Sequence, residues 1–223
     1  MCRLHISPYL HRAEHKAPYL STGLLSTANY VSYTTLYDMN MILSDEELLH
    51  ELRTGELVLT PFHEEDLQPA SIDMHLADGL QIPDPAETAL DPLHLPAHYT
   101  RQVHGRYYLR PGEFVLGSTV EQVTLSSRLA ARFEGKSSLG RLGLAVHITA
   151  GFIDPGFSGN ITLELHNVAP YNIILTPGMP IGQLCVVAVR GKVLRPYGAE
   201  ELGSRYQGQM GATASRGVIR HRT

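Results

Sequence analysis

Short apolar and alternating runs dominate the chain from residue 56 onward, and they predict a protein built mainly of β-strands. Pro-Gly pairs at 111–112, 155–156 and 177–178 separate several of the runs. Many short strands at this spacing, without helices between them, are typical of a β-sandwich, a jelly roll or a barrel. The predicted strands are Leu57–Thr60, Ser71–Leu76, Tyr107–Leu109, Glu113–Thr119, Gln122–Leu125, Leu129–Phe133, Leu144–Thr149, Ile161–Asn167, Asn172–Leu175 and Ile181–Val189.

One helix is predicted ahead of the strands. Ser44 is a suitable N-cap, Glu47 completes a capping box three residues later, and Gly55 ends the helix. Its apolar side is formed by Leu48, Leu49 and Leu52. Because this start follows a methionine so closely, Met41 is a candidate initiator, a hypothesis that N-terminal mass spectrometry of native protein would test.

Three segments show neither the helical nor the strand period of apolar residues. Residues 1–40 mix His, Tyr, Ser and Thr, and we expect a poorly ordered extension before a domain at 41–223. Residues 77–105, with their Pro and His, predict a long surface loop between strands. Residues 198–223 are rich in Gly, Gln, Ser and Arg, which predicts a lid that is either disordered or ordered by a ligand.

Composition narrows the class of protein. With 223 residues and a formal charge of -4, the chain is long enough for a full core and lacks the basic field that recruits nucleic acid. Its two cysteines, Cys2 and Cys185, are too few for a disulfide framework, so we expect a cytoplasmic protein. No apolar run approaches the ~20 residues of a membrane span, so no membrane partner is expected.

The candidate chemistry lies between residues 133 and 168. Gly135 to Arg141 is a Gly/Ser turn whose amides, hydroxyls and two cations could bind phosphate oxygens. Asp154 precedes a Pro-Gly turn, and Glu164 lies on the polar side of an alternating strand. Each feature has an ordinary alternative: a solvent-exposed turn, an aspartate that caps its own turn, and a solvated glutamate.

A zinc site of the nucleobase-deaminase kind is not expected. His63-Glu64-Glu65 supplies the first half of the His-x-Glu and Pro-Cys-x-x-Cys signature, but the second half is absent. The two distant cysteines cannot form the thiolate pair, and we expect no metal bound by side chains.

Taken together, the segments resemble the dUTPase superfamily and, within it, the dCTP deaminase family. The resemblance covers about residues 41–216 and rests on five motifs in order: Pro69–Leu76, Glu134–Gly143, Thr149–Gly159, Pro177–Leu184 and Tyr206–Arg216. It implies a distorted β-barrel or jelly-roll-like dUTPase fold, assembled as a homotrimer with sites between subunits.

The resemblance also implies roles for residues. The phosphate- and site-organising turn is carried by Lys136, Ser137, Ser138, Leu139, Gly140 and Arg141. Asp154 resembles the aspartate that meets the deoxyribose 3′-hydroxyl, and the strand that reads the cytosine edge is similar to Thr162, Leu163 and Glu164. Further nucleotide-holding positions are matched by Gln183, Tyr197, Arg205 and Gln209.

The implied reaction is hydrolytic deamination of dCTP, with Glu164 as the proton carrier, Ser137 holding the water, and magnesium expected only on the triphosphate. Gly151-Phe152 resembles the bifunctional branch, which continues through dUTP to dUMP and pyrophosphate, with Asp154 orienting the second water. Two alternatives stay open: a deaminase that releases dUTP, and a non-catalytic regulator on the same trimeric fold that binds dCTP or dTTP. If the protein is an enzyme, dTTP is a candidate inhibitor.

The tail departs from the family pattern in two ways. Arg205 stands where relatives usually have Lys, and Ala212 and Ala214 replace prolines in the usual Gly-Pro-Thr-Pro-Ser run. Both changes fall in the segment expected to close over the phosphates, so we expect altered lid behaviour and unaltered chemistry.

Overall fold

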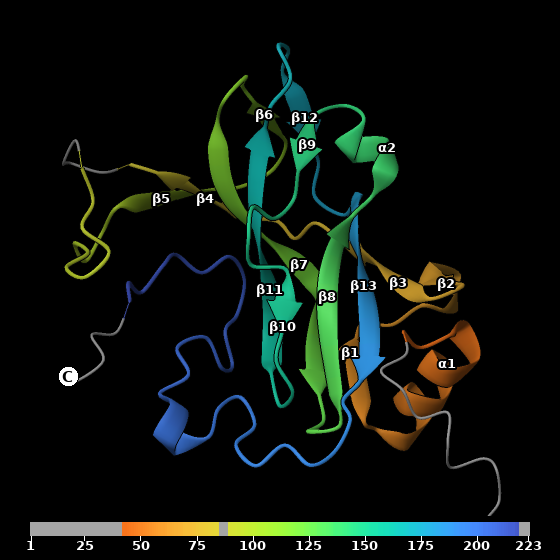
Figure 1. Cartoon of the computed structure of the whole chain (residues 1–223). Helices are drawn as coiled ribbons and strands as arrows, with labels where there is room; N and C mark the ends of the chain where they lie inside the picture. Colours follow the sequence, from red (N-terminus) through yellow and green to blue (C-terminus); the bar gives the residue numbers. More distant parts are fainter. Residues whose placement is uncertain (1–41, 85–88, 219–223) are drawn as a thin grey trace, which may run out of the picture. The chain divides into compact units, whose positions relative to one another are not determined.

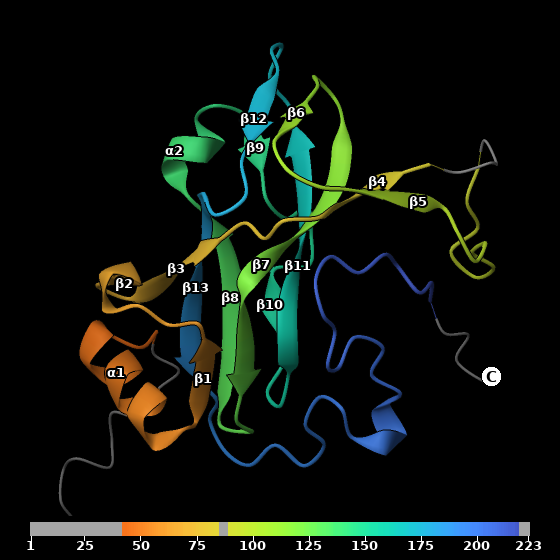
Figure 2. The same ribbon diagram turned by 180° about the vertical axis from the view of Figure 1, so that it is seen from behind.

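The computed structural model describes residues 42–84 and 89–218, shown in Figures 1 and 2. The predicted extension at 1–40 and the candidate initiator Met41 lie outside the described residues. None of the described helices is long and apolar enough to cross a membrane.

The predicted helix is confirmed as α1 (Asp45–Thr54). The side chain of Ser44 accepts the backbone N–H of Glu47, and the Glu47 carboxylate accepts the N–H of Ser44, so both halves of the capping box form. Gly55 ends the helix in the left-handed conformation. Leu48 is fully buried and fixes this helix against the core.

The fold is mainly β, as predicted. Within the described residues, the paired strands form three sheets, all antiparallel. The larger sheet has the order β5-β4-β7-β11-β9, with β1 also paired to β7; the second has the order β10-β8-β13-β3-β2. The core lies between these sheets, with Phe133 of β8 and Leu163 of β11 among its most buried side chains. The strands are β1 (Leu57–Thr60), β2 (Leu67–Gln68), β3 (Ser71–His75), β4 (Leu80–Pro83), β5 (Thr100–Val103), β6 (Tyr107–Leu109), β7 (Phe114–Leu125), β8 (Leu129–Gly135), β9 (Leu144–Ala145), β10 (Phe152–Ile153), β11 (Ser158–Asn167), β12 (Ile173–Leu175) and β13 (Pro180–Ala188). Three one-turn helices complete the described elements: η2 (Glu64–Asp66), α2 (Ser137–Gly140) and η3 (Glu200–Leu202).

Two strand predictions were wrong in their limits. The runs at 113–119 and 122–125 are one strand, β7, because the residues between them form a bulge rather than a turn. In its pairing with β11, Asn160 faces Gln122 and Thr162 faces Ser118, so three residues of β7 oppose Ile161 alone. The run predicted at 144–149 pairs only at β9, and the chain then leaves the sheet.

The segment at 77–105 is not only a surface loop. It contains β4 and β5, which pair with each other and extend the larger sheet beyond β7. Leu80 and Ile82 point into the core while Gln81 does not, which is the alternation of a half-buried strand. This arm carries residues 99–100 toward the C-terminal tail (Figure 1).

The described part of the predicted lid, residues 198–218, contacts β11 of its own chain. Gly208 N–H donates to the carbonyl of Ser158, and Gly159 forms a parallel bridge with Gln209. The tail therefore lies along the first half of β11 as a short additional strand. The last residues of the predicted lid, 219–223, lie outside the described residues.

Candidate active site

A cavity of about 520 Å³ lies between β11, β10, the β4–β5 arm and the tail. Its floor comes from the polar side of β11, and its far wall comes from segments that are distant in sequence. The lining residues are Pro83, Tyr99, Thr100, Phe114, Leu116, His147, Ala150, Phe152, Ile153, Asp154, Phe157, Ile161, Thr162, Glu164, Tyr197, Tyr206, Gln209, Thr213 and Ser215. Six of the predicted site residues therefore meet in one place: Phe152, Asp154, Thr162, Glu164, Tyr197 and Gln209.

Glu164 lies half-buried on the cavity wall and does not point into bulk solvent. Its neighbours Leu163 and Leu165 are fully buried on the core face, so strand alternation turns the carboxylate to the cavity. The carboxylate accepts the N–H of Ile148 at 2.7 Å and lies 3.4 Å from the N of Thr149. These contacts fix one carboxylate oxygen and the chain that follows β9, and Ala150, the next residue of that chain, also lines the cavity.

Asp154 lies exposed at the cavity mouth, before the predicted turn. The turn closes through backbone groups, since Phe157 N–H donates to the Asp154 carbonyl at 3.2 Å. Within the described residues the Asp154 carboxylate has no hydrogen-bond partner, so it does not cap its own turn. The rings of Phe157 and Tyr197 pack behind it with centroids 5.9 Å apart.

The predicted phosphate-binding turn lies elsewhere on the chain. Residues 137–140 form α2, with Lys136 at its N-cap, and residues 136–141 do not line the cavity of their own chain. Ser137, Ser138, Gly140 and Arg141 are exposed, while Leu139 packs partly against the core. Figures 1 and 2 show α2 and the tail on opposite sides of the molecule's β11 and β8 ribbons.

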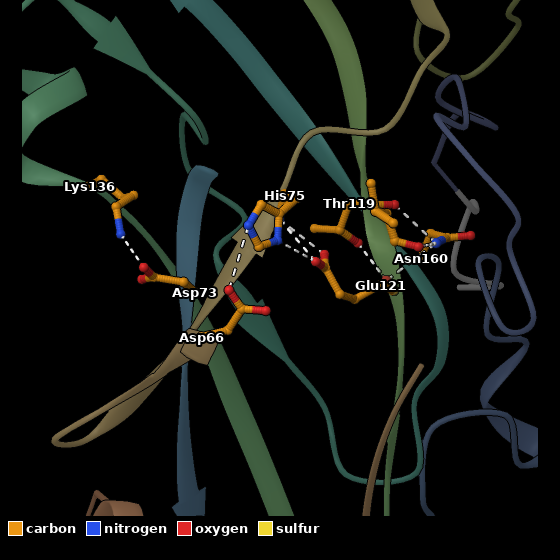
Figure 3. Close-up of polar contacts among 8 residues, drawn as sticks. Asp66, Asp73, His75, Thr119, Glu121, Lys136 and Asn160 are labelled. Atoms are coloured by element: carbon orange, nitrogen blue, oxygen red, sulfur yellow. Dashed lines mark hydrogen bonds and ion pairs between the residues drawn. The ribbon is translucent and has the colours of Figure 1, made fainter. Parts of the chain in front are cut away.

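Lys136 is held by a half-buried acid, Asp73. Its Nζ lies 2.6 Å from Oδ2 of Asp73 on β3, as Figure 3 shows. The other Asp73 oxygen is buried and has no partner among the described residues. Gln183 of β13 pairs in register with Asp73 on one side and with Glu134 of β8 on the other. The structure therefore brings Lys136 and Gln183 together in the second sheet, away from Glu164.

The arrangement was compared with known proteins. A family model described as dCTP deaminase-like matches residues 42–189. The chain belongs to the dCTP deaminase-like family. A protein of Beutenbergia cavernae named "dCTP deaminase, dUMP-forming" is 50% identical over 189 residues, which cover 82% of this chain and 98% of the relative. A protein of Clavibacter michiganensis with the same name is 51% identical over 181 residues, 79% and 90% of the two chains.

The solved 2'-deoxycytidine 5'-triphosphate deaminase of Agrobacterium tumefaciens superposes with a TM-score of 0.54 at 18% identity. The match covers 67% of this chain and 49% of that chain, and it shows the shared fold. The predicted family and the mainly β fold are thus both confirmed.

Gly151 and Phe152, the pair predicted to mark the bifunctional branch of the dCTP deaminase-like family, lie in different surroundings. Gly151 is buried, and a Cβ built there would lie 3.0 Å from the carbonyl of Phe133 and 3.3 Å from the ring of His147. Close packing therefore favours glycine at this position. Phe152 is exposed and lines the cavity.

Several cavity residues were missed by the sequence analysis. Tyr99 was assigned to a loop, and its hydroxyl donates to the carbonyl of Ser215 at 2.9 Å, which joins the β4–β5 arm to the tail. Burial raises the pKa of the Tyr99 phenol above its usual range. The alternation of apolar and polar residues at 80–82, after Gly79, was the sequence signal that could have predicted the β4–β5 arm. For Thr213 and Ser215, only the final motif pointed to this region.

Arg205, predicted to hold nucleotide, lies in the tail and does not line the cavity. Its guanidinium contacts the carbonyl of Arg216, and the guanidinium of Arg216 contacts the carbonyl of Arg205. Arg216 also lies over the ring of Tyr206, 5.7 Å from the centroid. Among residues 42–84 and 89–218, no three His, Cys, Asp or Glu side chains are grouped to hold a metal ion.

Proposed function

We propose that this protein hydrolyses dCTP to dUMP, ammonia and pyrophosphate in two steps in one site, as a homotrimer. The observation that carries the proposal is the position of Glu164, a half-buried carboxylate fixed at one oxygen by Ile148 N–H on a cavity wall. A carboxylate held this way can exchange protons with a water while its orientation stays constant. The names of relatives about 50% identical to the chain support the substrate and product.

In the first step, Glu164 takes a proton from a water held by Ser137 and by backbone carbonyls near residues 149–150. The hydroxide adds to C4 of the cytosine ring, and Glu164 passes the proton to the amino group. The C4–N4 bond then breaks and ammonia leaves, and transfer of the C4 hydroxyl proton to N3 gives the uracil carbonyl. Arg141 positions Glu164 or screens the charge that develops there.

In the second step, Asp154 orients a water for attack at the α-phosphate, which gives dUMP and pyrophosphate. Its carboxylate lies on the same cavity as Glu164 and is free of partners among the described residues. Magnesium enters as part of the nucleotide triphosphate substrate, bound to its phosphates. We expect dTTP to bind in this cavity and to inhibit the enzyme by competing with dCTP.

The homotrimer is part of this proposal because one chain does not supply every group. None of the cavity-lining residues in the described chain is Lys or Arg, although the site must accept a triphosphate. Of the two cations on the turn at 136–141, Arg141 is exposed, whereas Lys136 is half-buried and paired with Asp73, and neither lines the cavity of its own chain. We propose that this turn reaches the cavity of a neighbouring protomer and brings Ser137 and Arg141 to Glu164.

A product assay tests the reaction. Pure protein is incubated with dCTP and magnesium, and the nucleotides, ammonia and pyrophosphate are measured together over time. The proposal requires dUMP and pyrophosphate in equal amounts, matched by ammonia. Accumulation of dUTP without pyrophosphate would indicate the dUTP-releasing alternative, and saturable binding without ammonia would indicate the regulator.

Mixing two inactive variants tests the shared site. Glu164→Gln protomers are combined with Arg141→Met protomers under conditions that let trimers exchange subunits. If each site takes Glu164 from one protomer and Arg141 from its neighbour, about a quarter of the sites in a random equal mixture are intact. Recovery of about that fraction of wild-type activity supports the shared site; no recovery with proven exchange places both residues in one protomer.

A further inference from the structure

The tail at residues 205–216 lies along β11, and the backbone of Asn160 joins the two. Asn160 N–H donates to the carbonyl of Gln209 at 3.0 Å, and Gln209 Nε2 donates to the carbonyl of Asn160 at 2.6 Å. The approach is close, since a Cβ at Gly159 would lie 2.7 Å from the Gln209 carbonyl oxygen. Gly159 has φ +143°, which also favours glycine.

The amide group of Asn160 contacts the sheet on one side and the tail on the other. Its Nδ2 donates to the carbonyls of three consecutive β7 residues: Thr119 at 3.0 Å, Val120 at 3.2 Å and Glu121 at 3.2 Å. Its Oδ1 accepts the N–H of Gly211 at 3.0 Å. Because the donors face only carbonyls and the acceptor faces an N–H, the amide has one satisfactory orientation. Asn160 is only 6% exposed, so water cannot easily replace these partners.

The carbonyls that Asn160 contacts belong to the β7 bulge, and the bulge is fixed from behind. Thr119 Oγ1 donates to the carbonyl of Glu121 at 2.7 Å and accepts the N–H of Ile161 at 3.0 Å. The Glu121 carboxylate, 3% exposed, accepts the N–H of His75 at 3.0 Å and lies 2.7 Å from its Nδ1. Figure 3 shows this series of contacts from β3 through β7 to Asn160. The tail is therefore attached to a rigid part of the sheet.

The attached segment carries groups of the cavity wall. Gln209 lines the cavity, and Thr213 N–H lies 3.3 Å from Oγ1 of Thr162 on the cavity floor. Outside the cavity, the Gln207 side chain adds a second attachment, since it accepts the N–H of Ser158 and donates to the carbonyl of Gly156. Loss of either attachment should release the tail without removing a cavity group.

We propose that Asn160 is a positioning residue that holds the tail against β11, and so positions the tail groups that line the cavity. When this attachment is lost, nucleotide binding has to supply more of the free energy of ordering the wall, so nucleotide should bind more weakly. The effect on catalysis rests on the proposed function, whereas the effect on the tail does not. Gln207 supports the same attachment from the surface.

The test compares three variants of the full chain: Asn160→Ala, Gln207→Ala and the matched control Asn167→Ala. Asn167 lies on the same strand, is fully buried, and its amide donates to Leu109 and Tyr171 carbonyls and accepts Ala169 N–H, remote from the tail. Asn167→Ala should lower the free energy of unfolding by an amount similar to that lost in Asn160→Ala. Gln207 is exposed, so its substitution should not affect folding of the core.

Backbone hydrogen exchange of peptides covering 205–216 is the first measurement. Asn160→Ala removes the side-chain bond to Gly211 N–H and keeps the backbone bonds to Gln209, so exchange there should speed up by roughly 3- to 10-fold, the effect of one ordinary hydrogen bond. Gln207→Ala should act in the same direction, and Asn167→Ala should not affect this segment. Unchanged tail exchange in Asn160→Ala, or equal acceleration in Asn167→Ala, would overturn the proposal.

The second measurement is steady-state turnover of dCTP. Asn160→Ala and Gln207→Ala should raise KM by a similar factor with a smaller change in kcat, and Asn167→Ala should leave KM unchanged. A fall in kcat at constant KM would contradict a positioning role through the tail. If the wild-type protein does not turn over dCTP, the proposed function fails, while the exchange measurement still decides the role of Asn160.

Discussion

Glu164→Gln separates the chemical role of the carboxylate from its structural role. The Glu164 oxygen that accepts Ile148 N–H at 2.7 Å can be replaced by the amide oxygen of glutamine, which has the same shape. The contact with residues 148–149 should therefore remain. What the substitution removes is the negative charge and the capacity to take a proton from water.

The two effects differ in size. A hydrogen bond to a charged acceptor is worth about 1.5–3 kcal/mol and a neutral one about 0.5–1.5 kcal/mol, so the stability lost should be about 1 kcal/mol. For a domain of this size, that lowers Tm by roughly 2–4 °C. Loss of a general base lowers the rate by about 10²–10⁴-fold, which is roughly 2.7–5.5 kcal/mol in the activation barrier.

The assay is ammonia release from dCTP at saturating substrate, with binding measured by calorimetry and Tm by thermal melting. Glu113→Gln is a matched control, because Glu113 accepts a backbone N–H from Arg110 at 2.7 Å outside the cavity lining. We expect Glu164→Gln to bind dCTP and to lose turnover, and Glu113→Gln to retain it. Turnover of Glu164→Gln within tenfold of wild type would show that another group acts as the base.

Three further outcomes are expected. Asp154→Asn should reduce pyrophosphate release at least as strongly as ammonia release, and an unchanged dUMP yield would exclude its role in the second step. Burial, with the Tyr107 hydrogen bond to Glu113, raises the pKa of Tyr107 to about 12. The neutral phenol therefore adds stability that is complete below the unfolded pKa of about 10 and is lost as pH rises toward 12, so alkaline denaturation should be shallower in Tyr107→Phe. Gly182→Ala should destabilise the fold by about 1–3 kcal/mol or more in thermal melts, because its Cβ would lie 2.2 Å from the buried ring of Phe133; an unchanged Tm would refute this overpacking.

Local sequence signals predicted much of the fold. The Ser44–Glu47 capping box and Gly55 define α1 through contacts within four residues, and the alternation around Glu164 gave the correct face of β11. Both depend on backbone geometry that neighbouring residues determine. The family resemblance then gave six of the residues that the cavity brings together.

The errors concern contacts between distant residues. The residues at 119–121 look like a break in a strand, and they remain in β7 because Asn160, about 40 positions later, satisfies their three carbonyls. The tail is too polar for a core, and it contacts β11 through hydrogen bonds rather than through apolar burial. Polar composition alone does not distinguish a segment without partners from one whose partners lie in another part of the chain.

The basic turn and Glu164 also lie apart because of contacts between distant residues. This separation has the largest consequence for function. The turn ends β8, in the second sheet, and Glu164 lies on β11, in the larger sheet. The core that joins these sheets takes the apolar side of each, so Leu163 and Phe133 point inward while the polar side of β11 faces away from β8. Twenty-odd residues between two motifs therefore do not imply that their side chains meet within one chain. The cavity has no Lys or Arg in its described lining, and Arg141 is exposed on the turn, which is why a neighbouring protomer is the expected source of the missing charge.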